Sequence, residues 1–183
     1  MPRIALPSSL TDGVVLLRPF TRGDAPAIAR NCSDPEVPRW TRVPSPYTET
    51  HAHLFLDRIE LETDRGHVAS FAVCDVRDRA ALGTITLQRL DWDQSRADVG
   101  YYLGAEGRGR GLMTRALMVV TPWAFVRLGL ARLQIHADVR NRRSQRVAER
   151  AGFVREGVLR SYQALNGERQ DMACYSRLPV DAG

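Results

Sequence analysis

The chain has 183 residues, of which 44% are hydrophobic and 26% charged, a composition typical of a globular protein long enough to bury a substantial core. Its formal net charge is +5, and because it contains no lysine, all 26 basic residues are arginine. No apolar run approaches the ~20 residues that a membrane helix needs, so we expect no membrane partner. The first residues lack the apolar core of a signal peptide, and we expect a single cytoplasmic domain over 1–183.

The positive charge leaves a nucleic-acid partner open. The arginines are spread along the chain rather than gathered in runs, which favours a bias in base composition over a binding surface. A nucleic-acid binder is the third class of function that the sequence allows, and it predicts steeply salt-dependent binding to duplex or RNA.

Cysteine and histidine spacing argues against a metal site. Cys32, Cys74 and Cys174 are scattered and form no CxxC pair, so neither a disulfide framework nor a zinc site is indicated. His51 and His53 are two residues apart and would point in different directions on a helix. We therefore expect no bound metal, and reduced thiols that mostly fill the core.

The first half of the chain carries both helical and strand patterns. Four prolines among polar residues predict a loop at 33–47, and Thr48 is a helix cap without a full capping box, because His51 stands where such a box has glutamate. Partial alternation of apolar and polar residues predicts half-buried antiparallel strands further on. The expected elements are a strand at 13–19, a helix from 25, the loop at 33–47, a helix at 48–65, and strands at 68–75, 81–90 and 97–103.

The second half of the chain also carries both helical and strand patterns. An apolar stripe at helical spacing predicts a long helix that Gly129 ends and in which Pro122 removes one hydrogen bond. Strict alternation follows it and predicts a strand. The expected elements are a helix at 111–128, a strand at 131–139, a short helix at 141–151, and strands at 153–156 and 172–178. This order indicates α/β layering over a mixed sheet.

Residues 98–115 are the most informative stretch. A strand-like run ends in glycines and arginines, and a helix-like run follows at once. A glycine-rich turn lets backbone N–H groups converge, and the start of a helix adds unpaired donors and the positive end of the helix dipole. The stretch therefore predicts a site for a phosphate or pyrophosphate, with Arg108 and Arg110 as two further positive charges.

This stretch does not match two common phosphate-binding motifs. A Walker A loop needs a lysine, and the chain has none. A dinucleotide fingerprint needs Gly-x-Gly-x-x-Gly; Gly107 and Gly109 fit its first half, but Leu112 occupies the last position.

Ordered blocks along the chain carry a resemblance to a known family. The runs 109–117, 133–144 and 149–160, with the opening 15–24 and Asp171, resemble GNAT-superfamily acetyltransferases, and within them the RimJ/RimL type that acetylates protein N-termini. The resemblance covers essentially the whole chain. It implies an α/β (α+β) fold with a mixed, mostly antiparallel sheet of about seven strands, flanked by helices and with splayed central strands. It also implies a homodimer.

The same resemblance implies acetyl-CoA as co-substrate. Backbone N–H groups from Arg108 to Met113 would hold the pyrophosphate, and the strand from Val99 to Leu103 would pair with the pantetheine arm. Glu106 stands where the family usually has Gln or Arg, so its carboxylate must point away from the pyrophosphate or pair with Arg108. The implied cofactor-binding residues are Val99, Tyr101, Leu103, Arg108, Gly109, Arg110, Gly111, Leu112, Met113, Thr114, Asn141 and Ser144.

Acetyl transfer to an amine needs a base, an oxyanion donor and a proton for the leaving thiolate. Asn141 and Ser144 match the Asn-x-x-Ser of the family, which implies a pantetheine contact and a proton donor; both residue types also favour helix caps. Tyr101 and Tyr102 are rival proton donors, and a main-chain N–H near Tyr101 would polarise the thioester. Asp98 is the implied base, acting through a water.

The sequence indicates less about the acceptor than about the cofactor. We expect its pocket to be built from 33–47 and 157–170, with Trp40, Tyr47 and Tyr162 as lining residues. A peptide or protein N-terminus is the first expectation. The alternatives are a small amine, such as an antibiotic, polyamine or amino acid, and a non-catalytic CoA-binding module.

Overall fold

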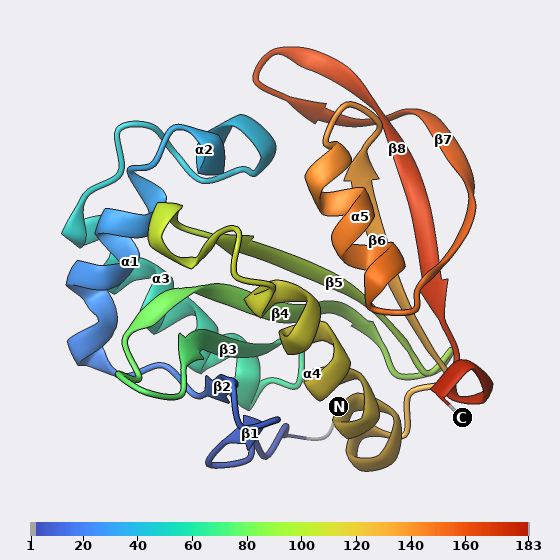
Figure 1. Cartoon of the computed structure of the whole chain (residues 1–183), viewed down its shortest axis with the longest axis horizontal. Helices are drawn as coiled ribbons and strands as arrows, with labels where there is room; N and C mark the ends of the chain where they lie inside the picture. Colours follow the sequence, from blue (N-terminus) through green and yellow to red (C-terminus); the bar gives the residue numbers. More distant parts are fainter. Residues whose placement is uncertain (1–2, 183) are drawn as a thin grey trace.

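The computed structural model describes residues 3–182 and shows one mixed sheet with helices on both faces (Figure 1). Within these residues the sheet has eight strands in the order β1-β2-β3-β4-β5-β6-β8-β7. The strands are β1 Leu10–Thr11, β2 Val15–Arg18, β3 Ala69–Asp75, β4 Ala81–Asp91, β5 Arg96–Leu103, β6 Arg132–Asp138, β7 Val154–Leu165 and β8 Glu168–Arg177. The α-helices are α1 Ala25–Cys32, α2 Glu36–Trp40, α3 Glu49–Asp64, α4 Leu112–Leu128 and α5 Arg142–Arg150; the 3-10 turns are η1 Arg22–Asp24, η2 Ala105–Gly107 and η3 Pro179–Ala182.

The centre of the sheet is splayed. All neighbouring strands run antiparallel except β5 and β6, which are parallel. Their register covers three positions and ends where Asp98 faces Gln134. Beyond it, β5 stays paired with β4 while β6 turns away with β8, so the two strands diverge (Figure 1). The predicted fold class, including the splayed central strands, is confirmed.

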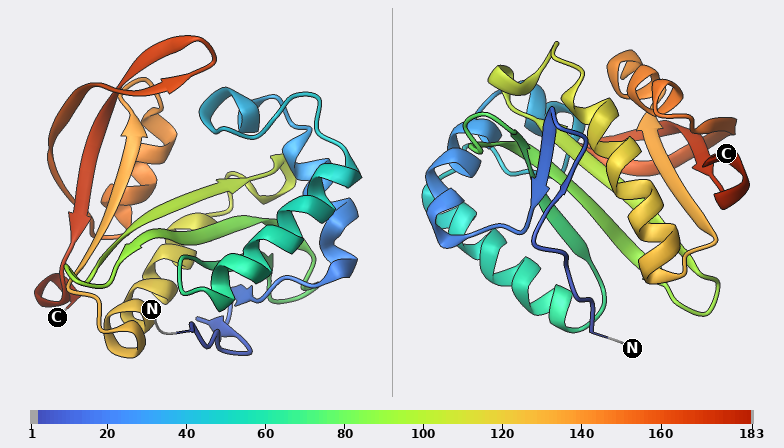
Figure 2. Two further views of the ribbon diagram at one scale, coloured as in Figure 1. Left: turned by 180° about the vertical axis from the view of Figure 1, so that it is seen from behind. Right: turned by 60° about the horizontal axis from the view of Figure 1, so that its bottom comes forward.

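Two apolar layers sandwich the sheet. The larger core joins α4 and α5 to one face, with Leu117, Ile85 and Ile135 fully or almost fully buried. A smaller cluster lies on the other face, where Ile28 of α1 and Leu56 of α3 pack together. Figure 2 shows α3 and α4 on opposite sides of the strands. Because successive strand residues point to opposite faces, β5 contributes to both layers.

Most expected elements form, with three differences. The predicted loop at 33–47 contains α2, a helix of a single turn with few buried residues and therefore a weak periodic signal. The two C-terminal strands were predicted too short, because β7 and β8 continue through 157–170 as one long hairpin, with a break in register between Leu159 and Gln163. β7 is exposed on both faces, so it lacks the alternation that marks a strand. The short β1 was missed.

The start of α3 corrects a prediction about its cap. Thr48 accepts a hydrogen bond from the N–H of His51, and its own N–H donates to His51 Nδ1 at 3.1 Å. The capping box is therefore complete, because the imidazole nitrogen takes the place of a carboxylate.

Across residues 3–182, no helix combines the length and apolar character that a membrane crossing requires.

Candidate active site

The glycine bend lies between β5 and α4. Gly109 and Gly111 have φ angles of +76° and +73°, a left-handed conformation that glycine adopts without strain. A Cβ atom at either position would meet nothing within 4 Å, so the space above the bend is open. α4 begins at Leu112, and the N–H groups of its first turn have no partner within the helix. The bend therefore leaves backbone N–H groups free at the start of α4, in a geometry that suits an anion.

Both arginines of the bend are held by carboxylates from other parts of the chain. Arg108 pairs with Asp34, which follows α1, and Arg110 pairs with Asp75 at the end of β3. Arg77 also binds Asp75, at 2.8 Å. The Arg77 hydrogen bonds, with the positive charge of Arg110, hold the pKa of Asp75 well below its usual range. The two guanidinium groups are thus fixed beside the bend.

Glu106 does not pair with Arg108. Its carboxylate is exposed and lies 3.9 Å from Arg30 Nε on α1. The Nε atom of Arg108 is buried and has no hydrogen-bond partner among residues 3–182. Burial and the charge of Arg143 lower the pKa of Arg108. The positive charges of Arg108 and Arg143 therefore lie near each other, and an anionic ligand would relieve their repulsion.

The edge of β5 beyond Asp98 carries the predicted pantetheine contacts. Val99, Tyr101 and Leu103 pair with β4 on one side, at Leu87, Ile85 and Gly83. Within residues 3–182, no β6 residue pairs with them on the other side. An extended chain bearing amides can add to such an edge by main-chain hydrogen bonds.

Tyr101 and Ser144 meet where α5 approaches β5. The Tyr101 hydroxyl lies 3.0 Å from Ser144 Oγ and donates to the Ser144 carbonyl at 3.2 Å. Burial raises the pKa of Tyr101 to about 12, so its phenol keeps its proton near neutral pH. Asn141 caps α5, because its Oδ1 accepts the Ser144 N–H at 3.1 Å. The structure therefore brings Tyr101 to Ser144, which lies 43 positions further along the chain, and Asn141 fixes the turn that carries Ser144.

Tyr102 points to the opposite face. Its hydroxyl accepts a hydrogen bond from Cys32 Sγ at 3.1 Å, and burial raises its pKa. Tyr47 packs in the same layer against His51, with ring centroids 5.3 Å apart. Tyr102 and Tyr101 are thus separated by the sheet rather than grouped at one reacting atom.

Asp98 lies where β5 and β6 begin to diverge, and it is buried. Gln134 Nε2 donates to Oδ1 at 2.6 Å, and Arg89 Nη1 donates to Oδ2 at 3.1 Å. His136 Nδ1 is 3.6 Å from Oδ2. Burial opposes ionisation of Asp98, but hydrogen bonding from His136 and Gln134 outweighs it and lowers the pKa. The carboxylate is therefore charged and held on both oxygens.

Sequence reasoning missed the partners of Asp98. Gln134 and His136 belong to the polar half of the alternating run that predicted β6, so the pattern placed them on one face. The pattern did not give the register with β5 that brings this face to Asp98. Tyr162 of β7, predicted for the acceptor pocket, stacks on His136 with centroids 5.0 Å apart.

A groove lies between α2 and the start of α5. Trp40 lines it together with several arginines and one carboxylate, Glu36, which lies 3.5 Å from Arg143 Nη1. The turn between β7 and β8 reaches α2, where Asn166 Nδ2 donates to the Pro38 carbonyl at 3.2 Å. The two segments expected to bind the acceptor therefore touch each other. The lining residues are Glu36, Arg39, Trp40, Arg140, Asn141, Arg142, Arg143 and Arg146.

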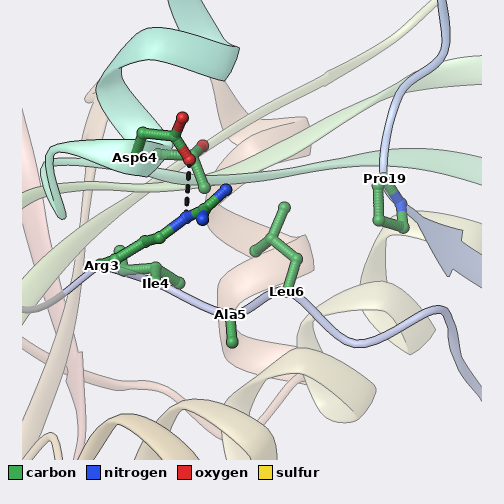
Figure 3. Close-up of a pocket in the computed structure, with 7 residues that line it drawn as sticks. Arg3, Ile4, Ala5, Leu6, Pro19 and Asp64 are labelled. Carbon is green, nitrogen blue, oxygen red and sulfur yellow. Dashed lines mark hydrogen bonds and ion pairs between the residues drawn. The ribbon is translucent and has the colours of Figure 1, made fainter.

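A second hollow lies beside the N-terminal segment and contains none of the predicted site residues. Arg3, Ile4, Leu6 and Pro19 line it, and Arg3 Nε donates to Asp64 Oδ1 at 2.9 Å (Figure 3). Both charged side chains are largely exposed, so this ion pair contributes little to stability. Over residues 3–182 no group of three or more His, Cys, Asp or Glu side chains is placed to hold a metal ion.

A comparison with known proteins identifies the family of this chain. The model of the acetyltransferase (GNAT) domain matches residues 15–154, which include β2 to β6, the glycine bend, α4 and α5. The chain belongs to the GNAT acetyltransferase family. The family that the sequence motifs indicated is thereby confirmed, and with it the class of N-acetyltransferases.

Individual GNAT relatives differ in their acceptors. The "Putative ribosomal N-acetyltransferase YdaF" of Bacillus subtilis strain 168 is 38% identical over 101 residues, which is 55% of each chain, so this match spans about half of that protein. Spermidine N(1)-acetyltransferase of Escherichia coli strain K12 is 26% identical over 84% of this chain and 80% of its own. A solved RimL structure, a ribosomal L7/L12 α-N-protein acetyltransferase in complex with coenzyme A, has a TM-score of 0.83 at 22% identity and covers 93% of this chain and 96% of that one. At that identity the likeness shows the fold alone.

Proposed function

We propose that this GNAT protein transfers an acetyl group from acetyl-CoA to a primary amine, and that the amine is the N-terminal α-amine of a protein or peptide. One observation carries the proposal: the open glycine bend at the start of α4 directly follows the unpaired edge of β5. A diphosphate on the bend would place an amide-bearing arm along that edge and its thioester near Asp98 and Tyr101.

The residues of the bend bind the cofactor in this proposal. N–H groups from Arg108 to Met113 hold the pyrophosphate, Thr114 donates its hydroxyl from the first turn of α4, and Asn141 contacts the pantetheine arm. Arg108 and Arg110 supply positive charge beside the bend, although each already has a carboxylate partner. Both guanidinium groups are partly exposed, so a phosphate can reach them and share them with those carboxylates.

Ser144 and Tyr101 serve the leaving group. The amine nitrogen attacks the carbonyl carbon and forms the C–N bond; the C–S bond then breaks and the thiolate takes a proton from the Ser144 hydroxyl. Tyr101, hydrogen-bonded to Ser144 Oγ, orients that hydroxyl and replaces its proton. A main-chain N–H of β5 near Tyr101 polarises the thioester carbonyl. Holding amine and thioester together supplies much of the remaining acceleration.

A small-amine acceptor is the second candidate. It is favoured by the spermidine-acetylating relative, which aligns over most of both chains, whereas the ribosomal relative YdaF aligns over about half. The groove between α2 and α5 favours the peptide instead, because its arginines would repel a polycation such as spermidine. Trp40, Tyr47 and Tyr162 are the proposed acceptor contacts.

Thiol release with a panel of acceptors tests the function. Purified protein is mixed with acetyl-CoA and, in turn, peptides with free N-termini, spermidine and amino acids, and free thiol and product mass are recorded. Each peptide is matched by the same peptide with a blocked N-terminus, which must stay inert. Turnover of peptides alone supports the first proposal and turnover of spermidine alone supports the second. CoA binding without turnover of any acceptor would indicate a non-catalytic module and overturn both.

Assembly and location follow as further proposals. We propose a homodimer that uses the edge strand β7, whose Val154, Val158 and Leu159 side chains are exposed. Light scattering that gives the mass of one chain at micromolar concentration would refute it. A cytoplasmic location is proposed because a ribosomal protein would meet the enzyme there.

A further inference from the structure

Asp98 is badly placed to take a proton from an amine. Both of its oxygens already accept hydrogen bonds, from Gln134 and Arg89, and its side chain is buried. The local hydrogen bonds lower its pKa below the ordinary value of an aspartate. An α-ammonium group titrates near pH 8, far above the range of an aspartate. Direct transfer to Asp98 is therefore strongly unfavourable.

His136 lies beside this carboxylate, and its imidazole is the side chain that most often serves as a general base. Its side chain is 10% exposed and projects from β6 two residues beyond the last pairing with β5. Its Nδ1 lies 3.6 Å from Asp98 Oδ2, so a hydrogen on Nδ1 would point to the carboxylate and leave the lone pair of Nε2 free to accept a proton. Among residues 3–182, no hydrogen-bond partner engages Nε2.

The surroundings hold the ring in this orientation. Tyr162 of β7 stacks on it at 5.0 Å with an interplanar angle of 36°. Cys174 of β8 is its cross-strand partner on the same face, and burial and the charge of Glu156 raise the pKa of that thiol, which stays neutral. Asp98 of β5 faces the ring, and Arg89 of β4 binds the same carboxylate oxygen. The imidazole is thus oriented by one carboxylate and one aromatic ring.

We propose that His136 is the general base of acetyl transfer, with Asp98 as the positioning residue that orients its ring. The inference rests on the acetyltransferase function proposed above. Nε2 takes one proton from the acceptor ammonium, and the neutral amine attacks the thioester carbon. The thiolate leaves and is protonated through Ser144 and Tyr101, the nitrogen of the new amide gives up its second proton, which restores the Tyr101 phenol through solvent, and the imidazolium releases its proton to water. The balance is one ammonium and one acetyl thioester giving one amide, one thiol and one proton.

The position of His136 in the sheet fits this role. Alternation places Asp98 and His136 on the face of α1 and α3, and Tyr101 on the face of α4 and α5. The gap between β5 and β6 joins these faces. The amine is therefore deprotonated on one side of the thioester, and the sulfur is protonated on the other.

Kinetics of His136→Gln, His136→Ala and Asp98→Asn test the proposal against a matched control, His67→Gln. His67 pairs with Glu62 at 2.7 Å at the end of α3, and no predicted site residue contacts it. We expect kcat of both His136 variants to fall by about 100-fold or more, as for loss of a general base, while the Kd for CoA changes less than about twofold. Asp98→Asn lowers kcat by a smaller factor, and His67→Gln leaves it unchanged. Added imidazole restores part of the activity of His136→Ala.

The pH dependence of wild-type kcat is a second measurement that needs no variant. A general base acts only in its unprotonated form, so we expect the profile of wild-type kcat to fall on its acidic side, and this limb to be absent from His136→Gln. A His136→Gln enzyme within about twofold of wild type, or a flat wild-type profile from about pH 5 to 8, overturns the role of His136 while leaving the acetyltransferase function intact. A wild-type protein that acetylates no acceptor overturns the proposed function and this inference with it.

Discussion

A pair of glycine substitutions at the two ends of α4 separates coenzyme binding from stability. Gly111 precedes the first turn with φ +73°, and Gly129 follows the last turn with φ +67°. A Cβ at either position would meet nothing within 4 Å, so Gly→Ala introduces only backbone strain. Gly111 belongs to the proposed pyrophosphate site and Gly129 lies at the other end of the helix. The second substitution is therefore a matched control for the first.

The expected magnitudes follow from the backbone. A left-handed conformation costs an L-residue about 1–2 kcal/mol, and reduced freedom of the unfolded chain offsets about 0.4–1 kcal/mol of this. Each variant should thus lose about 1 kcal/mol of stability, or about 2–4 °C in Tm for a chain of this size. If Gly111→Ala turns one N–H away from the diphosphate, it also removes a hydrogen bond to a charged group. Such a bond is worth about 1.5–3 kcal/mol, which weakens CoA binding about 10-fold or more.

Calorimetric titration with CoA and thermal melts of the free proteins provide the two readouts. We expect similar melting temperatures for Gly111→Ala and Gly129→Ala, and a weakened Kd only for Gly111→Ala. Wild-type affinity in Gly111→Ala would refute the placement of the diphosphate on this bend. A Gly129→Ala variant that binds as weakly as Gly111→Ala would refute it as well, because the loss would then come from α4 as a whole.

Three further predictions address ion pairs and the proton donor. Asp24→Ala should cost about 3 kcal/mol in chemical unfolding, because Asp24 forms a buried ion pair with an arginine, whereas Asp64→Ala removes an exposed pair and should cost less than about 1 kcal/mol; equal losses would contradict this. Ser144→Ala should lower kcat at least about tenfold in the thiol-release assay with an unchanged Kd for CoA, and unchanged turnover would remove Ser144 from the chemistry. Hydrogen bonds from Arg132 and Ser176 lower the pKa of Glu156 to about 2. Its stabilising effect is complete above its ordinary pKa of 4.5 and is lost as the pH falls toward 2, so Glu156→Gln should flatten this part of the acid-unfolding curve by about 1 kcal/mol or less, since the side chain is partly exposed. A wild-type curve that is already flat there would contradict it.

The sequence predicts those elements whose burial imposes a period. α4 and β6 each pack one face on the core, and their apolar spacing reveals both. β7 buries almost nothing over its 12 residues, so its sequence has no pattern to detect. α2 has one turn and one buried side chain, and no periodicity fits into five residues. The missed elements are those that tertiary contacts hold in place, such as the bond from Asn166 to α2.

In the candidate site too, local features could be predicted from the sequence and long-range contacts could not. The glycine bend is local, so its residues and its proposed role as an anion site follow from consecutive residues of the sequence. The pairs formed by Asp98 with His136 and by Tyr101 with Ser144 depend on strand register and on the docking of α5. The sequence shows each member of these pairs but cannot show which partner it meets.

β5 organises the whole site because one strand presents three different surfaces. Asp98 projects to one face and Tyr101 to the other, since an odd spacing of three residues reverses the direction of a strand side chain. Between them the main chain offers unpaired amides at the edge that β6 leaves. In the proposed mechanism, a thioester along this edge has its carbonyl carbon open to an amine from the face of Asp98 and its sulfur near the face of Tyr101 and Ser144. On this proposal, the divergence of β5 and β6 keeps the deprotonated nucleophile and the proton donor apart, so that the donor protonates the departing sulfur and not the attacking nitrogen.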